Sequence, residues 1–181
     1  MMNTEKLEKN IIEMLKEEQI KLGYCSESVR LYYPLESLNR LLDSNLDPAG
    51  MQDALAVFAA DERARLGELT VSHKGDRFCL VIPPEGSDYV HSLIGEDEFL
   101  VRFVEKMRNH PASIQEILGV FRMYSDHVRF EKAEGKDFDY LICFEDGDPD
   151  DFYYCITDEG EHLIYHRFTK GDFEDLYPAQ E

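Results

Sequence analysis

Two spacings of hydrophobic residues divide the first half of the chain. Apolar side chains recur every three or four positions over residues 7–22, 35–42 and 51–58, which is the spacing of helices with one buried face. Over residues 69–82 they alternate with polar neighbours around the turn HKGD, which predicts a β-hairpin. The stretch SVRLYY, between the first two helices, has the composition of a short strand.

The second half repeats this change from helical to alternating spacing. The pattern predicts a helix that starts near Asp97, a second after HPAS, and a closing helix after TKGD. Between the second and the closing helix lie four extended runs, HVRFE, FDYLICF, FYYCIT and HLIYHRF, separated by the turns EGK, DGDPD and DEGE. Short turns of this kind favour an antiparallel meander with the preceding helices on one face.

Pro83 and Pro84 mark the expected domain boundary, because two consecutive prolines cannot continue a strand ladder. The sequence therefore predicts an α+β protein with two parts. Residues 1–83 would form a three-helix unit with a hairpin, and residues 84–181 a helix-backed, four-stranded antiparallel sheet.

The order of elements in residues 4–83 resembles that of a winged helix. The third helix, from Pro48 to about Arg65, would then hold the recognition position, with HKGD as the tip of the wing. Its early polar positions are Gln52 and Asp53, and carboxylates there would repel phosphates. Arg63, Arg65, Lys74 and Arg77 make only a small basic patch, so we expect no nucleic-acid partner. A winged-helix DNA-binding regulator remains an alternative.

Acidic residues outnumber basic ones by 38 to 19, and the excess lies downstream of Pro83. Residues 1–83 hold 10 basic and 14 acidic residues, whereas the remainder holds 9 and 24. Such a surface repels nucleic acid and anionic headgroups and attracts cations or basic proteins. It therefore favours a protein-interaction or accessory module that docks a basic partner.

The distribution of cysteines and apolar runs bears on location. Four cysteines lie far apart without a CxxC pair, and no run of about 18 apolar residues is present. The amino terminus leads into no apolar signal core. We therefore expect a cytoplasmic protein with reduced thiols and no membrane association.

Aromatic and acidic residues crowd together near the C-terminus, and they supply the candidate docking residues Tyr153, Tyr165, Asp148, Asp150 and Asp151. On alternating strands half of the rings would face outward, where rings give contact area and carboxylates attract a basic partner. In the alternative, helices cover both faces of the sheet and every ring belongs to the core.

The loop EDGDPDD is the candidate metal site, with Asp146, Asp148 and Asp150 as ligands for a hard cation such as Ca²⁺ or Mg²⁺. It departs from an EF-hand loop, because Asp151 stands where glycine is required and Thr157 stands where the bidentate glutamate belongs. A solvated hairpin turn explains the same residues. A zinc site at His162 and His166 would need ligands from other strands, such as His127 or Glu131.

No catalytic signature is present, since the chain lacks GxSxG, HExxH, GxxxxGK and GxGxxG. The enzymatic alternative is a metal-dependent hydrolase that uses the Asp146–Asp151 loop with His127, His162 or His166. We expect a non-enzymatic protein without a cofactor. Cys143 and Cys155 fall on consecutive expected strands, where they would serve as small buried hydrophobes. The alternative is a cross-strand disulfide, which requires an oxidising compartment.

The stretches RFCLVIPPEGSDYVH and YHRFTKGDFEDLYP resemble an uncharacterised bacterial family of acidic proteins of about this length, a domain of unknown function. The resemblance covers essentially the whole chain. It implies a bacterial origin and supplies no catalytic residues.

Overall fold

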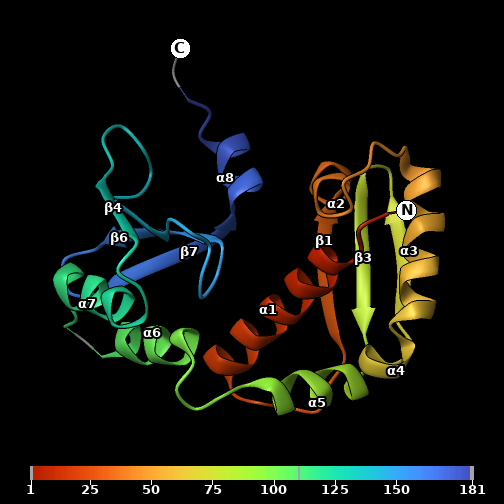
Figure 1. Cartoon of the computed structure of the whole chain (residues 1–181), viewed down its shortest axis with the longest axis horizontal. Helices are drawn as coiled ribbons and strands as arrows, with labels where there is room; N and C mark the ends of the chain where they lie inside the picture. The colour runs from red at the N-terminus through yellow and green to blue at the C-terminus, as the bar shows by residue number, and fades with distance from the viewer. Residues whose placement is uncertain (1, 110, 180–181) are drawn as a thin grey trace. The chain divides into compact units, whose positions relative to one another are not determined.

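A computed structural model describes residues 2–109 and 111–179. The chain separates into two compact units, Met1–Ile94 and Gly95–Glu181, which we call the N-terminal and C-terminal units. Both combine helices with an antiparallel sheet, which confirms the predicted α+β class (Figure 1).

The N-terminal unit has the predicted order of elements. Within the residues described, three strands pair antiparallel in the order β1-β3-β2, with Leu31 opposite Leu80 and Val71 opposite Leu80 on the other side. The first strand therefore lies beside the third. The elements are α1 (Glu5–Leu22), β1 (Val29–Pro34), α2 (Leu35–Leu41), α3 (Pro48–Asp61), α4 (Arg63–Leu66), β2 (Thr70–Lys74), β3 (Arg77–Ile82) and α5 (Pro84–Leu93).

The helices of this unit begin where local chemistry permits. The Asp47 side chain accepts a hydrogen bond from the Gly50 amide (2.8 Å), and Pro48 occupies the first turn of α3.

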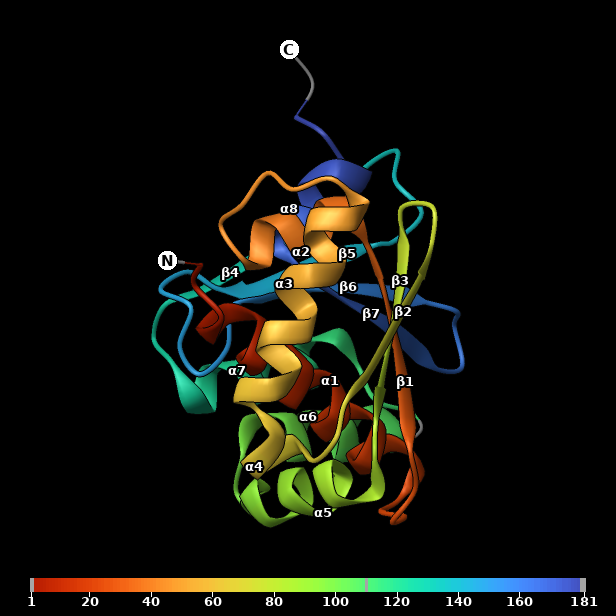
Figure 2. The ribbon, with the colours of Figure 1, turned by 90° about the vertical axis from the view of Figure 1, so that its right-hand side faces the viewer.

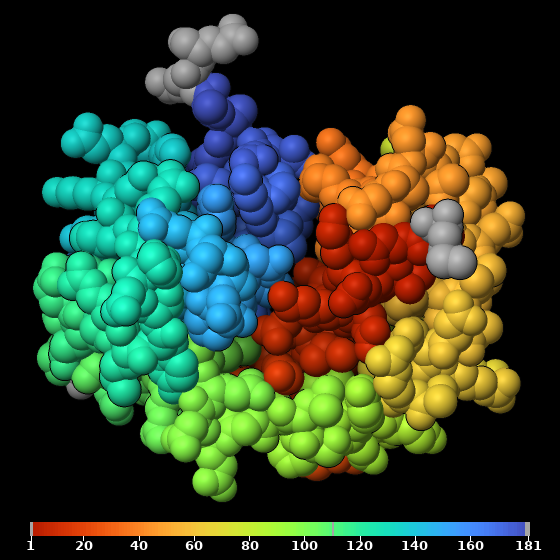
Figure 3. Space-filling view, in the orientation of Figure 1, coloured from red at the N-terminus to blue at the C-terminus, as the bar shows by residue number. Residues whose placement is uncertain are grey.

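In the space-filling view, α1 (red), the α2 region (orange) and α3 (yellow) lie on one face of the unit (Figure 3). Their apolar sides and the inner side of the sheet form one core, built from Leu7, Ile11, Leu15, Leu38, Leu55, Phe58, Phe78, Leu80 and Ile82.

The two prolines begin a helix instead of ending a domain. Pro83 caps α5 and Pro84 fills its first turn, where a missing N–H is tolerated. Helix α5 packs on α4 so closely that a Cβ at Gly86 would lie 2.5 Å from the Leu66 carbonyl oxygen. The predicted boundary after residue 83 is therefore misplaced, and the units divide between Ile94 and Gly95.

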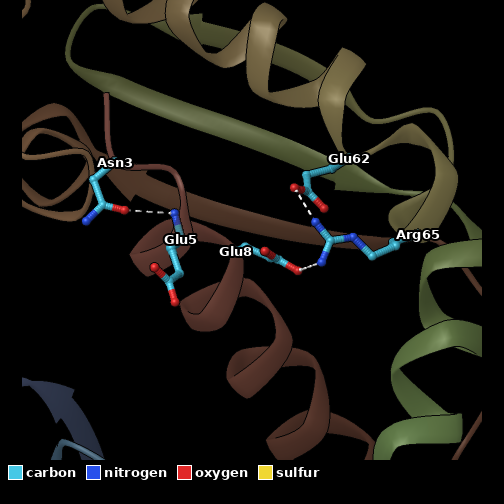
Figure 4. A network of polar contacts seen from close by, with 5 residues as sticks. All are labelled: Asn3, Glu5, Glu8, Glu62 and Arg65. Atoms are coloured by element: carbon cyan, nitrogen blue, oxygen red, sulfur yellow. Dashed lines mark hydrogen bonds and ion pairs between the residues drawn. The ribbon is translucent and has the colours of Figure 1, made fainter. Parts of the chain in front are cut away.

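The Arg65 guanidinium joins α4 to α1 and to the buried carboxylate of Glu62. Arg65 donates hydrogen bonds to Glu62 (2.8 Å) and to Glu8, so that its guanidinium lies between the two carboxylates (Figure 4). Burial, and then the nearby charge of Glu8, raise the pKa of Glu62, and the attraction of Arg65 only partly opposes them. Near the N-terminus, Asn3 accepts a hydrogen bond from the Glu5 amide.

The C-terminal unit is the predicted helix-backed meander. Its strands run in the order β4-β5-β6-β7 within the described residues, every pair antiparallel. The elements are α6 (Phe99–Arg108), α7 (Ile114–Tyr124), β4 (Val128–Lys132), β5 (Tyr140–Phe144), β6 (Phe152–Asp158), β7 (Leu163–Thr169) and α8 (Lys170–Leu176). Helix α7 begins with a capping box, in which Ser113 and Glu116 bond each other's backbone amides.

Helices α6 and α7 cover one face of this sheet with an aromatic core. Phe99, Phe103 and Phe121 meet Tyr154 edge-on, with ring centroids 4.9 to 5.7 Å apart. Tyr165 belongs to the same cluster, 4.7 Å from Phe103. Helix α8 covers part of the opposite face, where Phe173 packs with Phe138, Leu141 and Cys155.

None of the helices in the described segments combines the length and apolar character that a membrane span requires.

Candidate functional site

One row of side chains crosses the C-terminal sheet on the face that carries α8. The register places Arg129 opposite Cys143, Cys143 opposite Tyr153, and Tyr153 opposite Phe168. Since residues directly opposite one another point to the same face, all four side chains belong to one surface. Phe168 and the ring of Tyr153 pack in the core under α8, with Tyr153 5.0 Å from Phe173.

The first three members of this row line a hollow of about 420 Å³. Its remaining walls come from the end of β5, from the β5–β6 loop and from the start of α8. The whole lining is Arg129, Cys143, Phe144, Glu145, Gly147, Asp151, Tyr153 and Lys170. The strands of this sheet, β4–β7, run nearly across the view in Figure 2. We call this the sheet hollow.

Both cations of the sheet hollow are paired with carboxylates that are not part of its lining. Arg129 donates to the two carboxylate oxygens of Glu131 at 2.8 and 2.9 Å, a bidentate contact that raises the pKa of Arg129 and lowers that of Glu131. Lys170 lies 3.8 Å from Glu174, one turn along α8. Their positive charge is therefore largely balanced locally.

The two carboxylates of the hollow are in the opposite situation. Glu145 and Asp151 are both exposed, and neither side chain has a hydrogen bond or ion pair with any residue within 2–109 and 111–179. Two unbalanced negative charges beside an aromatic ring make a site for a cationic side chain, which a carboxylate pair attracts and a ring face accepts.

The thiol at the floor of the hollow is protected. Cys143 is buried, and burial raises the pKa of its thiol despite the opposing effect of Arg129. Burial raises the pKa of Cys155 to about 12. Both cysteines are free, and as buried, protonated thiols they fill space and are poor nucleophiles, as the sequence predicted.

Asp150 does not lie on the surface, contrary to the prediction that it binds a partner. It is 4% exposed, accepts a 2.6 Å hydrogen bond from the Tyr154 hydroxyl, and lies 3.6 Å from the Arg167 guanidinium. Arg167 is itself buried against the Phe152 ring, 3.8 Å from its centroid. Asp150 therefore anchors the loop to the aromatic core.

The inward direction of Asp150 also separates it from the other predicted metal ligands. Asp146 and Asp148 are exposed, and Asp146 accepts a hydrogen bond from the Asp148 amide in a local turn. Among the residues described, no three His, Cys, Asp or Glu side chains are grouped so that they could hold a metal ion. The predicted three-carboxylate site is not formed.

Of the candidate histidines, His127 contacts that loop only through its backbone, and the other two lie on or next to β7. His162 pairs with Glu159 (2.8 Å) in the turn before β7, while His166 stacks near Phe168 on β7. His127 precedes β4, and its carbonyl oxygen accepts a hydrogen bond from the Glu145 amide. No cluster of acid, base and nucleophile emerges from these positions.

Of the predicted docking residues, Tyr153 and Asp151 line the sheet hollow, and Asp148 is exposed in the same loop. Tyr165 lies half-buried in the core under α6. Its ring therefore packs inside the unit and is not part of a docking surface. Sequence reasoning missed Arg129, Glu145 and Lys170. Arg129 could have been predicted from the register of β4 against β5, because strands joined by a short turn pair residue by residue.

The exposed side of α3, the expected recognition helix, carries carboxylates and small or apolar side chains. Asp53, Ala56 and Asp61 are exposed, and Val57 is 58% exposed. No cation occurs in this helix to meet a phosphate.

Comparison with known proteins places the chain by family rather than by activity. No curated protein and no solved structure matches it. A family model matches residues 4–177, which is nearly the whole chain. The chain therefore belongs to the family described as "Domain of unknown function, E. rectale Gene description (DUF3877)", which confirms the resemblance seen in the sequence.

Proposed function

We propose that this protein is an interaction module whose C-terminal unit binds a basic segment of a partner protein, with one Arg or Lys side chain entering the sheet hollow. The observation that carries the proposal is the charge balance within the hollow. Arg129 is paired with Glu131 and Lys170 with Glu174, whereas Glu145 and Asp151 have no partner among the described residues.

Long-range electrostatics support the same partner. The C-terminal unit holds 22 acidic and nine basic residues, and the β5–β6 loop, EDGDPDD, has four exposed carboxylates and no cation. A surface of this kind attracts a basic segment from a distance, and the attraction falls as salt screens it.

The hollow adds specificity to that attraction. Tyr153 contributes a ring to its wall, and a guanidinium against a ring gains about 0.5–1 kcal/mol at a partly exposed site. An Arg side chain that passes between Glu145 and Asp151 and stacks on Tyr153 would use each of these groups. The partner is thus expected to present an exposed Arg among other basic residues.

Fluorescence anisotropy with a labelled Arg-rich peptide tests the proposal. The double variant Glu145→Gln/Asp151→Asn should weaken binding by roughly tenfold, equivalent to about 1.4 kcal/mol. The matched control is Glu134→Gln/Glu161→Gln, which removes the same charge from exposed residues in the loops at the other end of the sheet. This control should retain most of the affinity.

Two outcomes would overturn the proposal. One is the absence of peptide binding at low salt, and the other is an equal loss of affinity in both double variants, which would mean that only net charge matters. A second pair refines the site: Tyr153→Phe should bind as the wild type does, and Tyr153→Leu more weakly, because only the former keeps an aromatic ring.

A further inference from the structure

The N-terminal sheet presents an outer face whose charge is opposite to that of the chain as a whole. Its strands read VRLYYP, TVSHK and RFCLVI, which contain no Asp or Glu. Phe78, Leu80 and Ile82 point into the core, so the intervening residues of β3 and their partners point outward. The hairpin β2–β3 and strand β1 can be followed along their length in Figure 2.

The register orders this outer face into rows. Arg30 lies opposite Val81, Tyr32 opposite Cys79, and both Pro34 and Lys74 lie opposite Arg77. Tyr32, in the middle row, is 61% exposed. A cation thus occupies one end of the face, two cations occupy the other, and an exposed aromatic ring lies between them. The end rows are four residues apart, or about 13 Å along a strand.

These three cations are unbalanced. Arg30, Lys74 and Arg77 are exposed, and within the described part of the chain none of their side chains has an ion pair or a hydrogen bond. Asp76, in the turn of the hairpin, is the acidic residue nearest in the sequence to Lys74 and Arg77. Glu27 is the one nearest to Arg30, and Glu68, before β2, is paired with Arg63. Most other basic residues of this unit have carboxylate partners, as Lys6 has in Asp43.

The pairing of Lys74 with Arg77 is unfavourable in the free protein. Like charges directly opposite each other on neighbouring strands destabilise a sheet, and a local rule broken in this way is expected where a surface serves binding. A bound anion would relieve the repulsion.

We infer that this face, defined by Arg30, Tyr32, Lys74 and Arg77, docks an extended acidic segment of a protein partner, with carboxylates about four residues apart. A protein segment fits better than a nucleic acid because the N-terminal unit is itself net negative, with 16 acidic and ten basic residues, and the whole chain carries −19. A densely charged polyphosphate meets that repulsion along its length, whereas a short segment with a few carboxylates engages only the cationic face.

This inference is independent of the sheet hollow, which lies in the other unit and attracts the opposite charge. The experiment measures anisotropy of a labelled peptide of alternating Glu and Ser with the full chain. The triple variant Arg30→Gln/Lys74→Gln/Arg77→Gln should lose at least about tenfold in affinity. The matched control is Lys9→Gln/Arg122→Gln/Lys132→Gln, which removes three exposed cations that have no partner among the described residues. It should bind as the wild type does.

A labelled oligothymidylate serves as the competing ligand. Tighter binding of this single strand than of the peptide would overturn the inference in favour of a nucleic acid, and no peptide binding at low salt would also overturn it. Equal losses of peptide affinity in the two triple variants would also overturn the inference. Circular dichroism of each variant checks that the fold is retained, and the conservative Arg30→Lys/Arg77→Lys variant should keep the affinity within a few-fold, because it preserves the charge.

Discussion

Arg65 donates a 2.8 Å hydrogen bond to Glu62, a carboxylate whose side chain is only 6% exposed. Even with this partner, burial and the neighbouring Glu8 keep the pKa of Glu62 above its ordinary value. The folded protein therefore takes up a proton at Glu62 at a higher pH than the unfolded chain does, and protonation of this residue favours the folded state.

The first prediction concerns the pH dependence of that residue. The contribution of Glu62 is fully present below the pKa it has in the unfolded chain, and it is lost as pH rises through the raised pKa of the folded state. Glu62→Gln cannot ionise, so its stability relative to the wild type should increase with pH over this window. Urea unfolding of both proteins at several pH values measures the difference. A stability difference between Glu62→Gln and the wild type that stays constant with pH would contradict the prediction.

The second prediction concerns the capping box of α7. Hydrogen bonds from Ser113, together with the contact to Lys106, lower the pKa of Glu116 to about 2. Stability from this group is therefore present above its unfolded pKa and is lost as pH falls toward the folded value. Ser113→Ala should cost about 0.5–2 kcal/mol at neutral pH. It removes the side-chain contribution to the low pKa of Glu116 and keeps the larger contribution of the Ser113 backbone amide, so the pKa should rise only in part, which NMR titration would detect. An unchanged pKa would contradict the assigned cause.

The third prediction compares two aspartates of one loop. Asp150→Ala removes the carboxylate that faces the buried Arg167 and the Tyr154 hydroxyl, and should destabilise the protein by about 3–5 kcal/mol. Asp148→Ala, two residues earlier and exposed, should change stability by less than about 0.5 kcal/mol. Thermal unfolding measures both, and similar losses would show that Asp150 does not anchor the loop.

The fourth prediction compares two helical glycines. Gly86→Ala would place a Cβ 2.5 Å from the Leu66 carbonyl oxygen and from the Ile82 side chain, and should destabilise the packing of α5 on α4. Gly119→Ala, in α7, meets no atom within 4 Å among the described residues and should stabilise by about 0.5–1 kcal/mol through helix propensity. Opposite signs in chemical denaturation are the expected result, and a neutral Gly86→Ala would contradict the close contact.

Periodicity in the sequence predicted the strands well, because burial on one face enforces alternation. The runs around Phe78 and Tyr154 were assigned to strands from that pattern, and both residues are fully buried. Pro83 and Pro84 were misread because the same residues that stop a strand can also start a helix. Local sequence alone does not decide whether two prolines end a strand or begin a helix. Here the helix forms because α5 can pack closely against α4.

The candidate site was predicted only in part. Asp151 and Tyr153 were identified from composition, but Arg129 joins them only through the register of β4 against β5, and Lys170 through the position of α8 after β7. Asp150 was misplaced although a signal existed: Asp150, Phe152 and Tyr154 are two apart, so an extended chain turns all three to one face. Arg167, on a mostly apolar strand face, marked the need for a buried carboxylate.

The inward-facing Asp150 has a consequence for protein engineering. Asp150 secures the β5–β6 loop to the interior through Tyr154 and Arg167, so Asp146, Asp148 and Asp151 can be randomised while the scaffold is kept. A display library that varies these three codons and holds Asp150 constant would sample new ligand preferences on one fixed framework.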